Sequence, residues 1–449
     1  MNRYLNKEIL RLSIPSILAN LTVPLVGMVD TAVAGHLPVS GGLGAAEFIG
    51  GISVGALLFN LLYWNFFFVR ASTAGLTAQA FGRGDMQDCA RILWRGLVIS
   101  VGIALALVIL QWPIGHLGML LVNSSPEVAR LALTYFFIRI WAGPANLALM
   151  ALRGWFVGMQ DSVSSMLTDL VVNGVNIAAS IILSLGIGGW EGLGFPGVAW
   201  GTVAAQYSGL LFASLVCVFK YGRKVFGGVK PLESLGGDMR GFVSMNADLM
   251  LRSLGFTAIY MGYTTIAARF GNELLACSSI LMNILLIFSY FTDGFAYAGE
   301  ALTGRFIGAG DRPMTRLTVR YVFGWSIALG VLFMGLYQWG GMPLVRLLTD
   351  DAAVVEACRA YIPWLVLMPV FGCAAFAWDG IYVGATAARG IRNAMLGAAV
   401  AFFAVWLLGS RFTELPQVRM HVLLAAYFAH LLMRTVYLTV RYPKDILSK

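Results

Sequence analysis

Apolar runs of about twenty residues recur from one end of this chain to the other. A helix of about 20 apolar residues is long enough to cross the hydrocarbon core of a bilayer, so each run predicts one membrane span. Only 12% of the 449 residues are charged, about half the share of a soluble domain. The sequence therefore predicts an all-α, polytopic membrane protein with twelve spans, at approximately 12–35, 44–69, 92–115, 128–152, 163–187, 195–219, 243–268, 275–300, 317–340, 355–385, 393–410 and 420–440.

The positions of Lys and Arg orient these spans. When the loops are assigned alternately to the two sides, most basic residues fall on the side of the N-terminus. Because cytoplasmic loops carry the excess of Lys and Arg, both termini are predicted to be cytoplasmic. The net charge of +9 then reflects membrane orientation and not nucleic-acid binding. The few basic residues in the opposite loops are Arg130, Arg269, Arg346, Arg359, Arg411 and Arg419.

Cysteine and histidine give no sign of a metal or redox centre. The five cysteines have no C-x-x-C spacing, and the four histidines form no pair four residues apart. We therefore expect no metal and no cofactor. An intramembrane transferase, the alternative from the enzyme class, would need a nucleophile or base with partners or a long catalytic loop, and the sequence offers neither.

Two pairs of segments reveal an internal repeat. "GLTAQAFGRGD" at 75–85 matches "ALTGRFIGAGD" at 301–311, and "GWFVG" at 154–158 matches "GIYVG" at 380–384. Both pairs are 226 positions apart, and the same offset relates Thr31-Ala32 to Thr257-Ala258 and Tyr135 to Tyr361. Several matches at one offset indicate duplication of a six-span unit.

The repeat predicts two lobes of six helices each, at 1–219 and 243–449, with a cytoplasmic linker at 220–242. An even number of spans returns the chain to its starting side, so the halves are expected to be parallel repeats related by an axis along the membrane normal. Such two-lobed bundles are typical of alternating-access transporters.

Asp30 is the acid that most needs an explanation. It lies in the first span, within "TVPLVGMVDTAVAGHL" at 22–37, and has no Lys or Arg nearby on its own helix. A carboxylate within a bilayer costs about 3 kcal/mol on insertion scales, and intramembrane acids usually serve proton or ion pathways. We therefore expect Asp30 to exchange a proton near neutral pH, against the alternative of an acid that only hydrogen-bonds neighbouring helices.

The fifth span offers polar neighbours for this acid. In "TDLVVNGVNIAAS", Asp169, Asn173, Asn176 and Ser180 recur at helical spacing and share one face. Thr202, at the start of the sixth span, is expected to join them. Ordinary hydrogen bonding between helices is the alternative for any single member, but the whole stripe beside an uncompensated acid favours a site.

A second set of charges lies in the other half. Arg252, Asp293, Glu300 and Asp379 are predicted at comparable depths toward the cytoplasm, so we expect an ion-pair cluster that is either a gate or a structural staple. Arg139, in the fourth span, has no evident partner.

Five segments together resemble the MATE (multidrug and toxic compound extrusion) family, closest to its DinF-like, DNA-damage-inducible branch. They are "IPSILANLTVPLVGMVDTAVAGHL", "STAGLTAQAFGRGD", "NADLMLRSL", "TDGFAYAGEALTG" and "WDGIYVGATAARGIRNAM", and the resemblance extends from about residue 8 to 440. It implies twelve helices in two lobes and export of organic, often cationic compounds in exchange for H⁺ or Na⁺.

The resemblance also assigns a role to the first helix. The family's acid there corresponds to Asp30, and its protonation is expected to bend the helix, with Pro15 and Pro24 as the places to bend.

The fifth helix both matches the family and departs from it. The family's two asparagines followed by an acid correspond to Asn173 or Asn176 and then to position 180. Ser180 stands where many relatives have aspartate, which weakens a Na⁺ site, because such a site needs several oxygen ligands including carboxylates.

The sequence thus predicts a proton-coupled antiporter that exports amphipathic, cationic organic compounds by alternating access. Its partners would be a small organic substrate, H⁺ or Na⁺, and the lipid bilayer of the plasma (bacterial inner) membrane, and we expect a monomer. The alternatives are a Na⁺-coupled exporter of the same family and a lipid-precursor flippase of the same fold superfamily. A flippase for anionic precursors would be expected to line its cleft with several basic residues, for which only Arg139 and Arg252 are candidates.

Overall fold

The computed structural model describes residues 3–39, 42–120, 122, 124–227 and 239–448, and the described chain is almost entirely helical. Most of the predicted linker, 228–238, lies outside the described residues. Eleven helical segments are long and apolar enough to cross a membrane. They are α1 (Arg3–Gly35), α2 (Ala45–Trp64) continued by α3 (Phe68–Gly82), α4 (Met86–Ile109), α6 (Pro126–Arg139) continued by α7 (Gly143–Gly158), α8 (Ser162–Leu185), α9 (Phe195–Val216), α12 (Asn272–Gly308), α13 (Arg312–Leu348), α15 (Ile362–Gly384), α16 (Ala388–Gly409) and α17 (Pro416–Tyr442).

The twelfth helix is α11 (Met239–Ala267), which has sufficient length but is more polar. It carries Asp248 and Arg252. Three shorter helices, α5 (Gln111–Met119), α10 (Gly222–Phe226) and α14 (Ala352–Arg359), lie in the connections. The prediction of an all-α protein with twelve long helices is therefore confirmed.

The two halves start equivalent helices in the same way. α4 is capped by Asp85 and α13 by Asp311, and each carboxylate accepts a hydrogen bond of 2.9 Å from the backbone N–H three residues on. The glycine before each cap, Gly84 or Gly310, is left-handed, with φ of +75° and +71°. These cap pairs are separated by the offset found in the sequence.

The offset also holds at the ends of the halves. α9 and α17 each finish in a π-helical turn, at Cys217–Tyr221 and Pro443–Leu447. The left-handed residues Gln160 and Thr386 are equivalent as well. The repeat therefore extends through the whole of both halves.

The chain packs as two compact units. Unit 1 comprises Met1–Ile17, Ala78–Gly84 and Arg240–Lys449, and unit 2 comprises Leu18–Thr77 and Asp85–Met239. The predicted lobes divide the chain according to its sequence repeat, whereas these units divide it according to which residues are close in space. The start of α1 and the end of α3 belong to the first half of the sequence but pack in unit 1.

Unit 1 contains a close crossing of α3 and α12. A Cβ atom added to Gly82 would lie 2.0 Å from the carbonyl oxygen of Arg305, and one added to Gly308 would lie 2.0 Å from that of Gln79. Gly82 is the repeat equivalent of Gly308, and Gln79 that of Arg305. The contact is therefore the same from either helix at this crossing.

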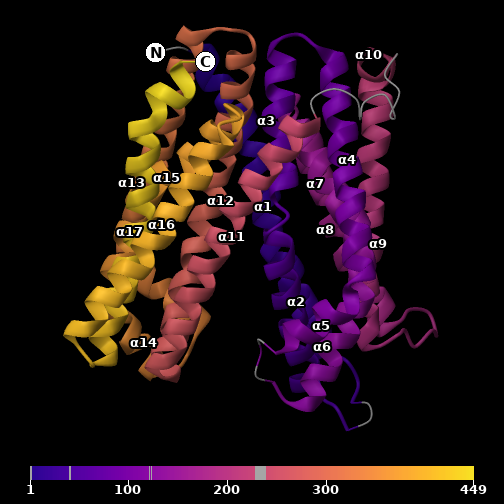
Figure 1. Cartoon of the computed structure of the whole chain (residues 1–449). Coiled ribbons are helices and arrows are strands. Elements are labelled where there is room, and N and C mark those ends of the chain that lie inside the picture. Colours follow the sequence, from indigo (N-terminus) through magenta and orange to yellow (C-terminus); the bar gives the residue numbers. More distant parts are fainter. Residues whose placement is uncertain (1–2, 40–41, 121, 123, 228–238, 449) are drawn as a thin grey trace. The chain divides into compact units, whose positions relative to one another are not determined.

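Each unit has its own apolar core. In unit 2 it surrounds Phe59, Tyr135 and Phe136, and in unit 1 it includes Phe288, Tyr337 and Phe402. α8 packs along α9 in unit 2, and α16 along α17 in unit 1 (Figure 1). Equivalent helices therefore pack together in the two halves of the repeat.

Candidate functional site

Asp30 lies near the end of α1 inside unit 2 and is only 6% exposed. Within the described residues it forms no ion pair, and its Oδ1 has no hydrogen-bond partner. The predicted uncompensated acid is therefore buried against other helices.

Two side chains from other helices act on the Asp30 carboxyl group. Ser180 of α8 lies within interaction range of it, although the Ser180 Oγ completes no hydrogen bond among the described residues, and Arg139 of α6 acts on it through charge. Ser180 is fully buried because α9 crosses α8 here: a Cβ atom added to Gly201 would lie 2.7 Å from the Ser180 Oγ. A small side chain at position 180 suits this crossing.

The other members of the predicted polar stripe bond to neighbouring helices. Asn176 Nδ2 donates to Thr202 Oγ1 at 3.1 Å, and both side chains are buried. Asn173 Nδ2 donates to the Thr22 hydroxyl of α1 at 2.5 Å. The structure thus joins the stripe of α8 to α9 and to α1.

Arg139 has partners that the sequence interpretation missed. Its Nη1 donates to Tyr135 Oη at 3.0 Å, and its guanidinium lies 4.8 Å from the centre of the Phe59 ring. Tyr135 is itself within interaction range of Asp30 and Thr202. The spacing of Tyr135 and Arg139 by four residues on one helix is the signal that could have linked them.

Asp169, at one end of the stripe, differs from Asp30. Its Oδ1 lies 2.6 Å from the Nε of Arg153 on α7. Asp169 is therefore an ion-paired acid, whereas Asp30 forms no ion pair within the part of the chain that the structure describes.

The second predicted set lies in unit 1, on α11, α12 and α15. Asp379 Oδ2 accepts hydrogen bonds from Arg252 Nη2 and from Arg434 Nη2, both at 2.5 Å. Arg434 of α17 is only 3% exposed. The expected pairing of Arg252 with Asp379 is present, and a second arginine that the sequence interpretation missed completes it. Glu300 is buried and Asp293 half-buried on α12.

The two prolines of the first helix fall in different units. α1 is helical across both, with Pro15 in unit 1 and Pro24 in unit 2. The unit boundary between Ile17 and Leu18 therefore lies between them. Bending at these positions stays a prediction.

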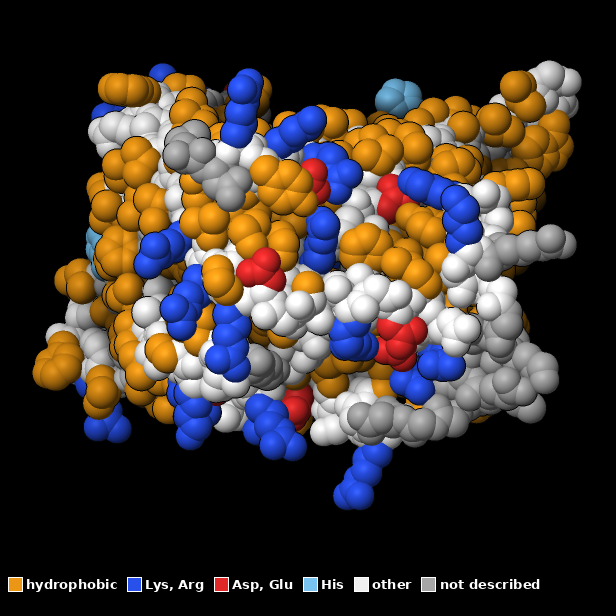
Figure 2. All heavy atoms as spheres, turned by 90° about the horizontal axis from the view of Figure 1, so that it is seen from above, with side chains coloured by type: hydrophobic (Ala, Val, Ile, Leu, Met, Phe, Trp, Pro, Cys, Tyr) orange, Lys and Arg blue, Asp and Glu red, His pale blue; other side chains and the backbone are white. Residues whose placement is uncertain are grey.

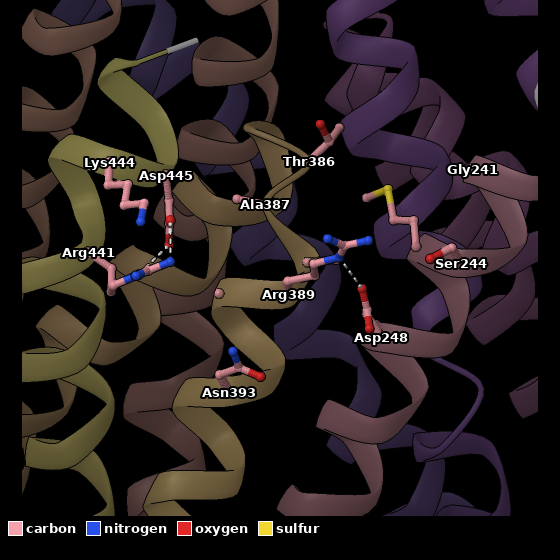
Figure 3. Close-up of a pocket in the computed structure, with 13 residues that line it drawn as sticks. Gly241, Ser244, Asp248, Thr386, Ala387, Arg389, Asn393, Arg441, Lys444 and Asp445 are labelled. Atoms are coloured by element: carbon pink, nitrogen blue, oxygen red, sulfur yellow. Dashed lines mark hydrogen bonds and ion pairs between the residues drawn. The ribbon is translucent and has the colours of Figure 1, made fainter.

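Unit 1 also contains a cavity of about 480 Å³, where α16 begins and α17 ends (Figure 3). Its charged side chains largely pair with one another: Arg389 lies 4.0 Å from Asp248, and Arg441 lies 3.1 Å from Asp445. The first pair joins α16 to α11, whereas the second lies within the end of α17 and the π-helical turn that follows it.

A model of the MatE family matches residues 15–182 and 249–412, in both halves of the chain. The chain belongs to the MatE family. Because members of this family are transporters, the MatE chain is a multi-pass membrane transporter and not an enzyme, as predicted from the sequence.

Sequence relatives agree with this assignment. The MatE chain is 34% identical to DNA damage-inducible protein F of Escherichia coli K12, over 96% of its own length and 90% of the relative. It is 26% identical to a probable multidrug resistance protein NorM of Pseudomonas aeruginosa, over 90% and 81%. The resemblance to the DinF-like branch is thus confirmed.

Solved structures share the fold. A MATE transporter in a bent conformation superposes with a TM-score of 0.84 at 16% identity, covering 99% of this chain and 97% of that one. An outward-facing multidrug resistance MATE transporter of the MOP superfamily gives 0.84 at 15% identity, with the same coverage. The MatE chain therefore has the fold of these transporters.

Proposed function

We propose that the protein is a secondary antiporter of the plasma membrane that exports amphipathic organic compounds, cations among them, in exchange for protons. Asp30 is the coupling carboxylate in this proposal. The observation that carries it is a buried acid, with no ion pair among the described residues, that has Ser180 of α8 and Tyr135 and Arg139 of α6 within interaction range. The relatives named as multidrug resistance proteins support the substrate class.

The polar neighbours of Asp30 are suited to both of its charge states. Ser180 and Tyr135 carry hydroxyl groups, which can donate to a carboxylate and accept from a carboxylic acid. Asn176 and Thr202 are already bonded to each other and hold α8 against α9. The Asp30 carboxyl group can therefore gain and lose a proton without its charge facing only apolar side chains.

Proton entry supplies energy only if the acid is reached from the outer side. Figure 2 views the end of the helices at which α1 begins and α17 ends, and Lys and Arg side chains are spread over that end. This supports the prediction that both termini are cytoplasmic, which would leave Asp30 near the outer face. Each proton that enters then gains about 2.3 kcal/mol per 100 mV of membrane potential.

The charges around Asp30 support H⁺ over Na⁺ as the coupling ion. A hard cation prefers several oxygen ligands, carboxylates among them. Asp30 is joined by Ser180 at the position where the family resemblance implies a second acid, and Arg139 already contributes a positive charge there. A proton needs no such ligand set, because it binds covalently to one carboxylate oxygen.

A flippase for anionic lipid precursors receives less support. Arg252 of α11 and Arg434 of α17 are both bonded to Asp379. Arg139 is bonded to Tyr135 and covers the Phe59 ring. These guanidinium groups are therefore already engaged.

The decisive test is efflux from proteoliposomes loaded with a fluorescent organic cation. Asp30→Asn keeps the size of the side chain but cannot exchange a proton, so efflux driven by a pH gradient should fall to the level of empty liposomes. Glu127→Gln, which removes an exposed acid from the same unit, should transport like the unaltered protein. Undiminished efflux by Asp30→Asn would refute the assignment.

The coupling ion is resolved in the same vesicles. A pH gradient imposed without Na⁺ should drive efflux, and a Na⁺ gradient at equal pH should not. The opposite result would replace H⁺ by Na⁺ and leave the exporter function standing.

A further inference from the structure

Two cysteine thiols meet near one end of unit 1. Cys277 lies in the second turn of α12, and Cys358 lies near the end of α14. Both side chains are 0% exposed, belong to the same apolar core and are in direct contact with each other. The two sulfur atoms are free thiols in this structure.

The surroundings hold the two thiols together. α12 packs against α14, and both sulfur atoms lie beside Tyr361, which is 1% exposed. The Tyr361 backbone N–H donates to the carbonyl of Cys358 at 2.9 Å and so fixes the end of α14. Within the described chain these cysteines belong to no group of side chains that could hold a metal ion.

The repeat shows that this closeness is a property of the helix crossing. The positions equivalent to Cys277 and Cys358 in the first half are Gly51 and Ala132, and both are buried. A Cβ atom added to Gly51 would lie 2.6 Å from the Cβ of Leu131, the neighbour of Ala132. Where the first half has two of the smallest residues at its crossing, the second half therefore has two thiols.

The location of the pair decides its redox environment. α14 lies at the end of unit 1 opposite to the start of α1 and the end of α17 (Figure 1). If both termini are cytoplasmic, as the charge distribution predicts, this end faces the periplasm, where disulfides form and persist.

We infer that Cys277 and Cys358 form a disulfide that ties α14 to α12 on the periplasmic side. The two thiols together lose two protons and two electrons, and a sulfur–sulfur bond forms between them. The electrons reduce the disulfide of a periplasmic thiol-oxidising protein to its dithiol, through a mixed disulfide. Because both sulfur atoms are buried in the folded protein, the exchange takes place before α14 docks on α12.

The disulfide closes the chain from 277 to 358 into a loop that contains the whole of α13. A crosslink of this length restricts the unfolded chain, and here it would also hold α14 in place. It is independent of proton coupling at Asp30 and rests only on the proposed orientation.

Counting reactive thiols tests the inference. Protein purified from cells at low pH, so that thiols and disulfides do not exchange, is denatured and treated with a maleimide polymer that shifts its gel mobility for each thiol it labels. After reduction all five cysteines are available, so five additions are expected. Without reduction three are expected, and five additions without reduction would overturn the inference.

Matched variants identify the pair. Cys277→Ser or Cys358→Ser alone should give four additions without reduction, because the partner is set free. Cys373→Ser, in the same unit, should give two, because it removes a thiol that was already free. A count of two in Cys277→Ser would contradict the pairing, because Cys277 would then have been one of the free thiols.

Two further measurements separate this inference from the proposed function. Glu414→Cys, in the exposed connection between α16 and α17, should react with a membrane-impermeant maleimide on intact cells if that connection is periplasmic. Absence of that reaction would overturn the periplasmic location and with it the disulfide. The double variant Cys277→Ser/Cys358→Ser should still export in proteoliposomes but melt several degrees lower, and an unchanged melting temperature would contradict a stabilising crosslink.

Discussion

Asp30 of unit 2 and Asp379 of unit 1 are both acids within long apolar helices, but their surroundings are opposite. Asp379 is held by two arginines at 2.5 Å, whereas Asp30 forms no ion pair in the described chain. A carboxylate between two guanidinium groups is a fixed charge, since protonation would leave both cations uncompensated. Of these two acids, Asp379 is therefore the one whose charge is fixed by its neighbours.

The internal repeat makes this difference sharper. The residues equivalent to Asp30, Asn176, Ser180 and Thr202 in the second half are all aromatic: Phe256, Phe402, Trp406 and Phe428. All four belong to or pack against the apolar core of unit 1. The halves therefore share their helices, caps and close crossings, while the polar chemistry around the first acid occurs in one half only.

The largest expected effect comes from a substitution that breaks the Asp379 ion pairs. Asp379→Asn leaves two buried guanidinium groups without their carboxylate, so the free energy of unfolding should fall by about 3–5 kcal/mol. Thermal unfolding in detergent, with expression level as a second readout, measures this loss. Asp30→Asn should show a much smaller loss, and equal losses would remove the contrast between the two acids.

A triple variant separates the role of this cluster in transport from its contribution to the stability of the protein. The triple variant Arg252→Met/Asp379→Leu/Arg434→Met replaces all the charges by apolar side chains of similar volume, which should restore most of the stability. If the stable triple variant exports normally, the cluster is a staple. A stable variant that cannot export would identify the cluster as a gate.

An intermediate effect tests the similarity of the halves. Gly82→Ala and Gly308→Ala each place a methyl group against a backbone carbonyl, so each should lower the free energy of unfolding by about 1–3 kcal/mol. Gly324→Ala, whose added Cβ would meet nothing within 4 Å, is the matched control and should be neutral or stabilising. Clearly unequal losses at the two positions would argue against a two-fold relation at this crossing.

The smallest effect concerns the start of α8. Burial alone would raise the pKa of Asp161, but hydrogen bonds from Lys220 and Tyr221 hold its pKa below the usual value. The equivalent residue in the second half is Ala387, and no side chain caps α16 there. Asp161→Ala, which makes α8 start like α16, should therefore cost about 1 kcal/mol at neutral pH.

The pH dependence of that loss follows from the sign of the shift. Because the pKa of Asp161 is lowered in the folded state, its contribution is complete above the unfolded value of about 4 and disappears as the pH falls below it. The melting temperatures of the variant and the unaltered protein should thus converge between pH 6 and pH 3. A constant difference over this range would show that the ionised carboxylate contributes nothing.

Much of the architecture could be predicted because it depends on local properties of the chain. The length of each apolar run gave the twelve helices, and the shared offset of the glycine-rich segments gave the duplication. The polar stripe from Asn173 to Ser180 could be predicted since helical spacing fixes which residues share a face. Asp30 was evident because an acid in an apolar run needs a reason.

The partners of the charges could not be predicted in the same way. Arg434 completes the cluster at Asp379 from a helix 55 positions further along, and Arg139 reaches the surroundings of Asp30 from α6. Thr22 receives its bond from Asn173 across 151 positions. No regular spacing relates such residues, because which helices touch and at which turn is set by packing over the whole unit.

The sequence by itself determined the membrane spans, the duplication and the presence of an acid that requires compensation, since each depends on composition or periodicity along one helix. Only the tertiary structure decided which acid is compensated. It placed Asp379 between two arginines of other helices and set Asp30 beside the hydroxyl groups of Ser180 and Tyr135. The physical reason is that a buried charge responds to the groups within a few ångströms of it, and those groups come from distant parts of the chain.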